Sequence, residues 1–301
     1  MLTDCVDLHS HSTASDGRLT PQQLVARARE IGLRALALTD HDTVGGLEAL
    51  HAAAKDSGLE TISGVEISAD FAKGTMHIVG LFVSTADPEF RAFLKKLADG
   101  RNIRNPQIVE KLRGMGFDIT MKEVEDEAGI GVEGGGGGAI DKSIGRPHIS
   151  AVLIKKGFVR NKQEAFDKYL AKGAPAYVSR FVASPEESIR QIHSAGGIAV
   201  LAHPTYLKAE STDEMERIVG DLKSKGLDGI EVHYSTHTPE QTELCARLAT
   251  KFDLTPSGGS DFHGETGRTG KTVELGTGIG NSLRIPYRVL EGLKARHAAR
   301  R

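Results

Sequence analysis

The chain has 301 residues, of which 39% are hydrophobic and 26% are charged. This is enough to bury one large core, or one core and a smaller inserted unit. The 38 basic and 40 acidic residues nearly cancel, so no overall positive field would hold long nucleic acid in a stable complex. The two cysteines, Cys5 and Cys245, lie far apart without a CxxC spacing, which argues against a disulfide framework or a thiolate zinc site.

The N-terminal sequence and the apolar runs bear on location. The first residues lack a basic leader followed by an apolar stretch. No run approaches the roughly 20 apolar residues that a membrane-spanning helix needs. Because the few cysteines also fit a reducing compartment, we expect a cytoplasmic protein without a membrane association.

Short apolar runs alternate with helical patterns in the first hundred residues. The expected strands cover 6–9, 35–38, 61–65 and 77–83, and the expected helices cover 21–31 and 43–57. The first of these helices has Thr20 before it, proline at its first position, and Gly32 to end it. Such alternation predicts parallel βαβ units and an α/β fold, in which we prefer a barrel to a doubly wound sheet.

The pattern changes between residues 99 and 174, where no strand is obvious. Helical patterns there cover 106–114, 122–128, 147–156 and 162–170. We expect a small helical insertion that contributes to the substrate pocket, with the barrel formed by 1–98 and 175–301. The run Gly134–Gly138 lacks the ending of a nucleotide-binding loop and is expected to be a flexible loop.

The alternation resumes after the insertion. The expected helices cover 185–194, 213–225, 239–252 and 286–297, and the expected strands cover 198–202, 229–232 and 254–256. Both halves of the chain therefore contribute strands to one predicted sheet.

Histidines and carboxylates collect where the expected strands end. His9 and His11 follow the first strand, and residues two apart in extended chain project to the same side, so both imidazoles can reach one ion. Asp261 and His263 repeat this spacing. One such pair alone is as often an ordinary polar feature as a metal site, but two pairs are harder to dismiss.

Further candidates stand in equivalent places. His41, Glu66 and His203 each follow an apolar run, and Asp16 lies in the loop after the first strand. The carboxyl ends of barrel strands meet at one rim, so these side chains are expected to converge. His77 instead precedes its run, and the pattern alone favours a hydrogen-bonded edge residue there.

These donors predict a metal centre. Imidazoles and carboxylates without thiolates suit manganese, zinc or iron better than calcium. Six histidines and three carboxylates are too many for one ion, so we expect two or three divalent ions with Glu66 as a bridging ligand. Mn²⁺ is the ion we expect, with Zn²⁺ and Fe²⁺ as alternatives. The candidate ligands are His9, His11, Asp16, His41, Glu66, His203, Asp261 and His263, with His77 as a ninth candidate that the pattern alone does not favour.

The order of these candidate ligands along the chain, and the short motifs that contain them, resemble those of the polymerase and histidinol phosphatase (PHP) family of phosphoesterases. The matching motifs are Asp7-Leu8-His9-Ser10-His11, Thr39-Asp40-His41-Asp42-Thr43, Gly64-Val65-Glu66, His77, Ala202-His203-Pro204 and Gly259-Ser260-Asp261-Phe262-His263-Gly264. The resemblance implies a distorted (β/α)7 barrel with two or three metals, and it makes His77 a ligand. It implies one ion at His9, His11, Glu66 and Asp261, a second at Glu66, His77 and His203, and a third at Asp16, His41 and His263.

The sequence of the insertion resembles one branch of this family. Its sequence Gly145-Arg146-Pro147-His148 looks like the branch of 3',5'-nucleotide bisphosphate phosphatases and 5'-to-3' exoribonucleases. Arg146 can bind a phosphate through two nitrogens, and His148 is close enough in sequence to assist. The alternative is that Pro147 starts a helix and its neighbours only cap it.

The expected reaction is hydrolysis of a phosphoester in a small nucleotide or a short oligonucleotide. Metal coordination lowers the pKa of water, which would then attack phosphorus in line. Glu66 and Asp261 would hold the ions, and His203 is one candidate to protonate the leaving oxygen. Histidinol-phosphate phosphatase is the alternative enzyme. A non-catalytic, metal-stabilised module is the alternative of another class, although such modules typically show eroded ligands.

Overall fold

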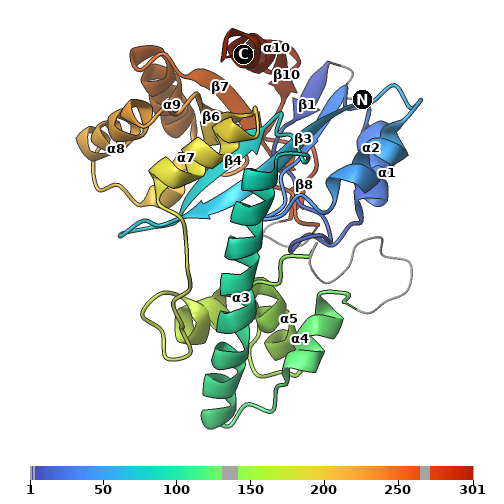
Figure 1. Cartoon of the computed structure of the whole chain (residues 1–301), viewed down its shortest axis with the longest axis vertical. Coiled ribbons are helices and arrows are strands. Elements are labelled where there is room, and N and C mark those ends of the chain that lie inside the picture. Colours follow the sequence, from blue (N-terminus) through green and yellow to red (C-terminus); the bar gives the residue numbers. More distant parts are fainter. Residues whose placement is uncertain (1, 3, 131–141, 265–271, 301) are drawn as a thin grey trace.

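The computed structural model describes residues 2, 4–130, 142–264 and 272–300 (Figure 1). The run Gly134–Gly138, for which we expected a flexible loop, lies outside the described residues. Within the described part, no helix is both long and apolar enough to cross a membrane.

Seven strands follow one another around a nearly closed barrel. They are β1 (Cys5–Asp7), β2 (Ala35–Leu38), β3 (Glu60–Ala69), β4 (Met76–Leu81), β5 (Ile198–Leu201), β6 (Gly229–Tyr234) and β7 (Thr255–Gly259). The amide of Leu8 donates to the carbonyl of Gly258 over 3.3 Å, and Ser10 bridges to Phe262, so the segments after β1 and β7 close the ring. The short strand β10 (Ile285–Pro286) adds to the outer edge of β1. The predicted distorted (β/α)7 barrel is confirmed.

The orientation of β4 differs from the expectation. β4 runs antiparallel to both β3 and β5, whereas we expected only parallel units. Only residues 70–75 join β3 to β4, and a parallel pair needs a crossover of a dozen residues or more. The start of β4 therefore lies beside the carboxyl ends of its neighbours, and His77 pairs with Ser68 near the end of β3.

Helices cover the outside of the barrel and one of its ends. The covering helices are α1 (Pro21–Ile31), α2 (Leu47–Ala54), α7 (Pro185–Ser194), α8 (Thr212–Ser224), α9 (Pro239–Lys251) and α10 (Arg288–Arg300). Side chains such as Leu36 and Leu38 of β2 belong to the buried cluster shared with the surrounding helices. Their neighbours Ala35 and Ala37 belong to a second cluster, which Leu290 of α10 joins. This alternation arises because successive side chains of a strand point to opposite faces of the sheet.

The longest helix links the barrel to the insertion. The predicted helix 106–114 is only the last third of α3 (Pro88–Gly114), which at 1.5 Å per residue is about 40 Å long. Pro106 lies inside it rather than at its start. Proline in a helix interior costs a hydrogen bond, but both halves of α3 bury apolar side chains, and this packing outweighs the local preference. Phe90 packs in the barrel cluster, whereas Ile108 packs in the insertion cluster.

The insertion has a buried cluster of its own. Its elements are the end of α3, α4 (Met121–Glu127), α5 (Arg146–Lys155), α6 (Lys162–Ala165) and a π-helical turn at Phe166–Leu170. Figure 1 shows α4 and α5 beside the half of α3 that extends away from the barrel, on the side of the barrel opposite to α10. Because α3 is continuous across residue 99, the division at 98/99 stays a prediction.

Candidate metal centre

The predicted ligands meet at one rim of the barrel because the chain keeps its strand-like course beyond β1, β2 and β7. The amide of Asp261 donates to the carbonyl of His9 over 2.9 Å, and the amide of His11 donates to the carbonyl of Phe262 over 2.9 Å. On the other side, His41 bridges to Glu66 in β3. These backbone contacts place residues that are distant in sequence side by side, as the barrel geometry predicts.

One group joins His9, His11, Glu66 and Asp261. His11 Nε2 lies 3.2 Å from Glu66 Oε2 and 3.2 Å from Asp261 Oδ1. His9 Nε2 lies 3.4 Å and 3.5 Å from the other Glu66 oxygen and the same Asp261 oxygen. The membership of this group is the one that the resemblance implied for the first ion.

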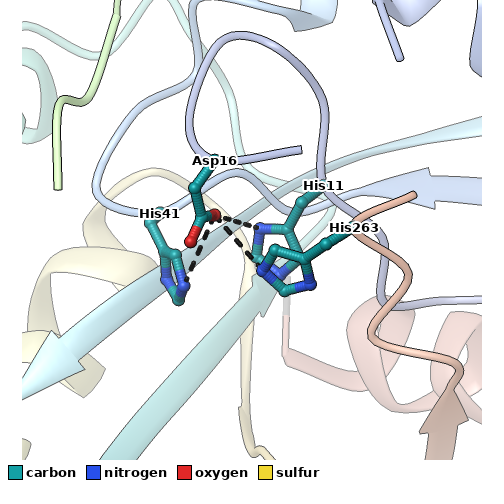
Figure 2. A group of neighbouring side chains, drawn as sticks. All are labelled: His11, Asp16, His41 and His263. Atoms are coloured by element: carbon teal, nitrogen blue, oxygen red, sulfur yellow. Dashed lines mark ion pairs between the residues drawn. The ribbon is translucent and has the colours of Figure 1, made fainter. Parts of the chain in front are cut away.

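A second group joins His11, Asp16, His41 and His263. Figure 2 shows the Asp16 carboxylate between His41 on one side and His11 and His263 on the other. Asp16 Oδ1 lies 3.2 Å from His263 Nε2, 3.9 Å from His41 Nε2 and 4.0 Å from His11 Nδ1. This group contains the three residues implied for the third ion, with His11 in addition.

A third group joins His41, Glu66 and His77. Glu66 Oε1 lies 2.7 Å from His77 Nδ1 and 2.8 Å from His203 Nε2, while Glu66 Oε2 lies 2.9 Å from His41 Nδ1. The preference for His77 as an edge residue rested on a parallel β4, and the antiparallel strand removes that reason. Glu66 stands at the centre of the cluster, in a position suited to a bridging ligand.

The buried donors fit divalent cations. Burial raises the pKa of Asp16, Glu66 and Asp261, but neighbouring histidines outweigh it and hold each pKa well below its ordinary value. A buried polar atom without a partner costs free energy unless an ion or water satisfies it. In the described part of the chain, such atoms include His9 Nε2, His11 Nε2, Asp16 Oδ1, His41 Nδ1 and Glu66 Oε2.

The cluster of predicted ligands opens into a cavity of about 590 Å³. Asp16, Glu66 and His77 line one part of it. Four arginines line another part, although the near-neutral chain gives no hint of such a concentration of positive charge. They are Arg101, Arg104, Arg146 and Arg180.

The four arginines have unequal partners. Arg101 and Arg180 both pair with the buried carboxylate of Asp42. Arg104 is only 4% exposed and donates twice to Asn105 Oδ1, and no carboxylate pairs with it among the described residues. Burial and the neighbouring guanidinium groups, Arg101 first, lower the pKa of Arg104 far below its ordinary value. This strong local positive potential favours binding of an anion.

Comparison with known proteins decides the family. The PHP domain family matches residues 7–124. A 5'-3' exoribonuclease of Haemophilus influenzae is 38% identical to this chain over 91% of it and 96% of the exoribonuclease. The chain belongs to the PHP family. It is therefore a hydrolase of phosphoesters, and the family resemblance noted from the motifs is confirmed.

Two further relatives extend the comparison. A 3',5'-nucleoside bisphosphate phosphatase of Chromobacterium violaceum is 38% identical to this PHP protein, over 90% of it and 92% of the phosphatase. A crystal structure from Bifidobacterium adolescentis, provisionally assigned as a metal-dependent phosphoesterase, superposes with a TM-score of 0.82 at 29% identity. That match covers 97% of this chain and 96% of the other. The likeness therefore includes both the barrel and the insertion.

The two predicted substrate contacts of this PHP protein lie in different surroundings. Arg146 lines the cavity, and its Nη1 donates to the carbonyl of Leu170 over 2.9 Å. His148 is buried, and its Nδ1 accepts from the amide of Gly145 over 3.0 Å. His148 thus has the capping role that we gave as the alternative, and its contact with a substrate stays a prediction.

Sequence reasoning missed two residues, Glu231 and Tyr234, that contact the predicted ligands. Glu231, in the apolar strand β6, accepts hydrogen bonds from the His9 ring and from the His203 backbone. Tyr234 Oη donates to Asp261 Oδ2 over 2.7 Å. Asp40, which flanks His41, accepts from the amide of Ser12 and so helps to fix the loop that carries Asp16. A charged residue within a buried apolar strand was the available signal for Glu231.

Proposed function

We propose that this PHP protein removes the 3'-phosphate of 3',5'-nucleotide bisphosphates such as phosphoadenosine phosphate. We also propose that it releases 5'-nucleotides from short 5'-phosphorylated oligonucleotides. The observation that carries the proposal is the group of four arginines in the same cavity as the metal centre. A cavity with two separate places for anions suits a substrate with two phosphates.

The reaction would take place at the nine predicted ligands. Two or three divalent ions, Mn²⁺ in our proposal, would lower the pKa of a water molecule and stabilise the charge that develops on the phosphoryl oxygens. Glu66 contributes both carboxylate oxygens to the middle of the cluster. Asp261 is held from the other side by Tyr234, which keeps its second oxygen directed toward His9 and His11.

His203 fits the ligand role better than that of proton donor. Its Nε2 faces Glu66 Oε1 at 2.8 Å, and its Nδ1 is buried without a hydrogen-bond partner. His203 lines the cavity but is only 2% exposed, and its Nε2 is already engaged by Glu66 and His77. The proton for the leaving oxygen would then come from water within the cavity.

The arginines would hold the second phosphate. Arg104 has no carboxylate partner among the described residues and would donate charge-assisted hydrogen bonds to the oxygens of this phosphate, together with the predicted contact Arg146. Arg101 and Arg180 pair with Asp42 and would add mainly positive potential. Anchoring the remote phosphate orients the other phosphate for attack, which converts binding into a gain in rate. This assignment adds Arg104 to the predicted contact Arg146.

Three features support this substrate class over the alternatives. The relatives named as exoribonuclease and bisphosphate phosphatase are equally similar to this chain, which supports both nucleotide activities. Histidinol phosphate carries an ammonium group, which the arginine-lined wall would repel. The near-neutral net charge of the chain, which we expect to act in the cytoplasm, also favours small nucleotides and short oligonucleotides over long RNA.

The test is release of phosphate and nucleotide from three substrates in the presence of Mn²⁺. They are phosphoadenosine phosphate, a 5'-phosphorylated trinucleotide and histidinol phosphate, each repeated with a chelator. We expect metal-dependent turnover of the first two. Turnover of histidinol phosphate alone would contradict the proposal, and so would turnover of any substrate that survives complete removal of metal.

A further inference from the structure

Glu231 is a buried carboxylate that touches two predicted ligands at once. It lies in β6, is 1% exposed, and has no arginine or lysine partner in the described part of the chain. One oxygen, Oε1, accepts from His9 Nδ1 over 2.7 Å. The other, Oε2, accepts from the backbone amide of His203 over 2.5 Å. Both acceptor atoms therefore contact predicted ligands at the rim of the barrel, which we call the metal rim.

The first contact fixes which nitrogen of His9 is available. An ionised carboxylate only accepts hydrogen bonds, so His9 Nδ1 must carry the proton that it shares with Glu231. In the neutral ring, which is the form that binds a cation, the lone pair is then on His9 Nε2, and this atom is buried without a hydrogen-bond partner. It faces Glu66 and Asp261 at 3.4 Å and 3.5 Å. Glu231 thus selects the tautomer of His9 that can bind an ion at this position.

The second contact helps to hold the backbone of His203 in an unfavourable conformation. His203 has φ 29° and ψ 65°, a region that residues with a side chain rarely adopt. Such a conformation persists only where the surroundings hold it, and the hydrogen bond from its amide to Glu231 is one such restraint. In this conformation His203 Nε2 reaches Glu66 Oε1 at 2.8 Å and His77 Nδ1 at 3.2 Å.

We infer that Glu231 is a positioning residue that orients His9 and His203 together and thereby sets the affinity of the centre for divalent metal. His9 follows β1 and His203 follows β5. One carboxylate on β6 therefore forms hydrogen bonds to two predicted ligands that come from different strands. The inference rests on the metal dependence in the proposed function, but not on the proposed substrate. It adds a residue outside the nine predicted ligands.

The chain offers a matched control at the other end of the same strand. Asp228, just before β6, also accepts from a histidine ring and a β5 backbone amide, namely His193 Nε2 at 2.7 Å and Ala199 N at 2.9 Å. Asp228 contacts none of the predicted ligands. Asp228→Asn and Glu231→Gln therefore weaken the same two kinds of hydrogen bond, and only the second touches predicted ligands. Asp228→Asn also removes an ion pair with Arg300 at 3.2 Å, so the control perturbs the fold at least as much.

The experiment is calorimetric titration of the metal-free full chain with Mn²⁺, together with its melting temperature. A glutamine can accept from only one of the two donors, so we expect Glu231→Gln to weaken Mn²⁺ binding about 10- to 100-fold. We expect Asp228→Asn to lower the melting temperature but leave Mn²⁺ affinity within about twofold, because distant sites act independently. Since no nucleotide is present, a failure of the proposed substrate would not affect this result.

Two results would overturn the inference. One is a folded Glu231→Gln variant that binds Mn²⁺ as tightly as the wild type and differs only in melting temperature. If that variant does not fold, Glu231→Asp keeps the charge on a shorter side chain that cannot span both donors, and weaker Mn²⁺ binding is again expected. A folded Glu231→Asp variant with wild-type Mn²⁺ affinity would then reject the positioning role.

Discussion

Asp42 Oδ2 accepts two hydrogen bonds from Arg101, from Nε at 3.0 Å and from Nη2 at 2.5 Å. This pair joins the loop after β2 to the middle of α3, and thus the metal rim to the helix that leads into the insertion. Arg180 donates to the same oxygen over 2.9 Å. Asp42 also follows His41 directly, and its backbone amide donates to the backbone carbonyl of Glu66 over 2.9 Å. One carboxylate therefore fixes the arginines relative to the metal centre.

Replacing Asp42 by asparagine should destabilise the fold strongly. The carboxylate is fully buried, and its loss leaves Arg101 and Arg180 without their anion. Breaking a buried ion pair typically costs about 3–5 kcal/mol, which we expect as the loss in free energy of unfolding at pH 7. Urea denaturation measures it. Asp99→Asn, which removes an exposed pair with Lys95 on α3, should cost less than about 1 kcal/mol.

The same pair predicts a pH dependence. Burial raises the pKa of Asp42, but Arg101 and Arg180 outweigh it and hold this pKa well below its ordinary value. The folded state then binds fewer protons than the unfolded state below about pH 4, so this stabilisation is complete above that pH and is lost as the pH falls. The difference in stability between wild type and Asp42→Asn should shrink from pH 7 to pH 3. A constant or growing difference would contradict the ion pair.

Removal of metal should lower the thermal stability of the protein. The buried donors of the centre, including Glu66 Oε2 and His11 Nε2, lack hydrogen-bond partners. Mn²⁺ at 100 times its dissociation constant should raise the free energy of unfolding by about 2.7 kcal/mol. Scanning calorimetry would show this as a higher melting temperature. Glu66→Gln should abolish most of this increase, because Glu66 contacts ligands in all parts of the cluster. An equal increase in the variant would exclude Glu66 from the centre.

Tyr234→Phe should impair catalysis more than folding. It removes the hydrogen bond to Asp261, which has a positive φ of 57° and depends on such contacts for its orientation. We expect kcat/KM to fall about 10- to 100-fold and the free energy of unfolding to fall by about 1 kcal/mol. Tyr287→Phe is the matched control, because Tyr287 bonds to Glu60 away from the metal rim. Equal loss of activity in both variants would argue against this role.

The sequence predicted local elements well where caps and period agree. The helix Pro21–Ile31 and the strand Ala35–Leu38 have the predicted bounds, because Thr20 and Gly32 provide strong boundary signals. The helix α3 was largely missed, since Pro106 resembled a helix start and the packing that sustains the helix is tertiary. The antiparallel direction of β4 follows from its short connection to β3, residues 70–75, which is too short for a parallel crossover.

The candidate site shows the same division. The predicted ligands stand in short motifs, so the residues that converge on Glu66 could be named from the sequence. Arg101 and Arg104 could not, because they lie on an unpredicted part of α3 and meet Arg180 only in the folded chain. For His148 the motif left substrate contact and helix capping open, and the structure shows the capping contact with the amide of Gly145.

The central claim is that one cavity binds a metal-held phosphate and, at the arginines, a second phosphate. The most direct test compares kcat/KM for phosphoadenosine phosphate and adenosine 3'-monophosphate with Mn²⁺, in wild type, Arg104→Gln and the exposed control Arg113→Gln. We expect the wild type and Arg113→Gln to prefer the bisphosphate, and Arg104→Gln to lose about 10- to 100-fold of that preference, the value of one charge-assisted contact. Equal use of both substrates by the wild type, or an unchanged preference in Arg104→Gln, would contradict the account.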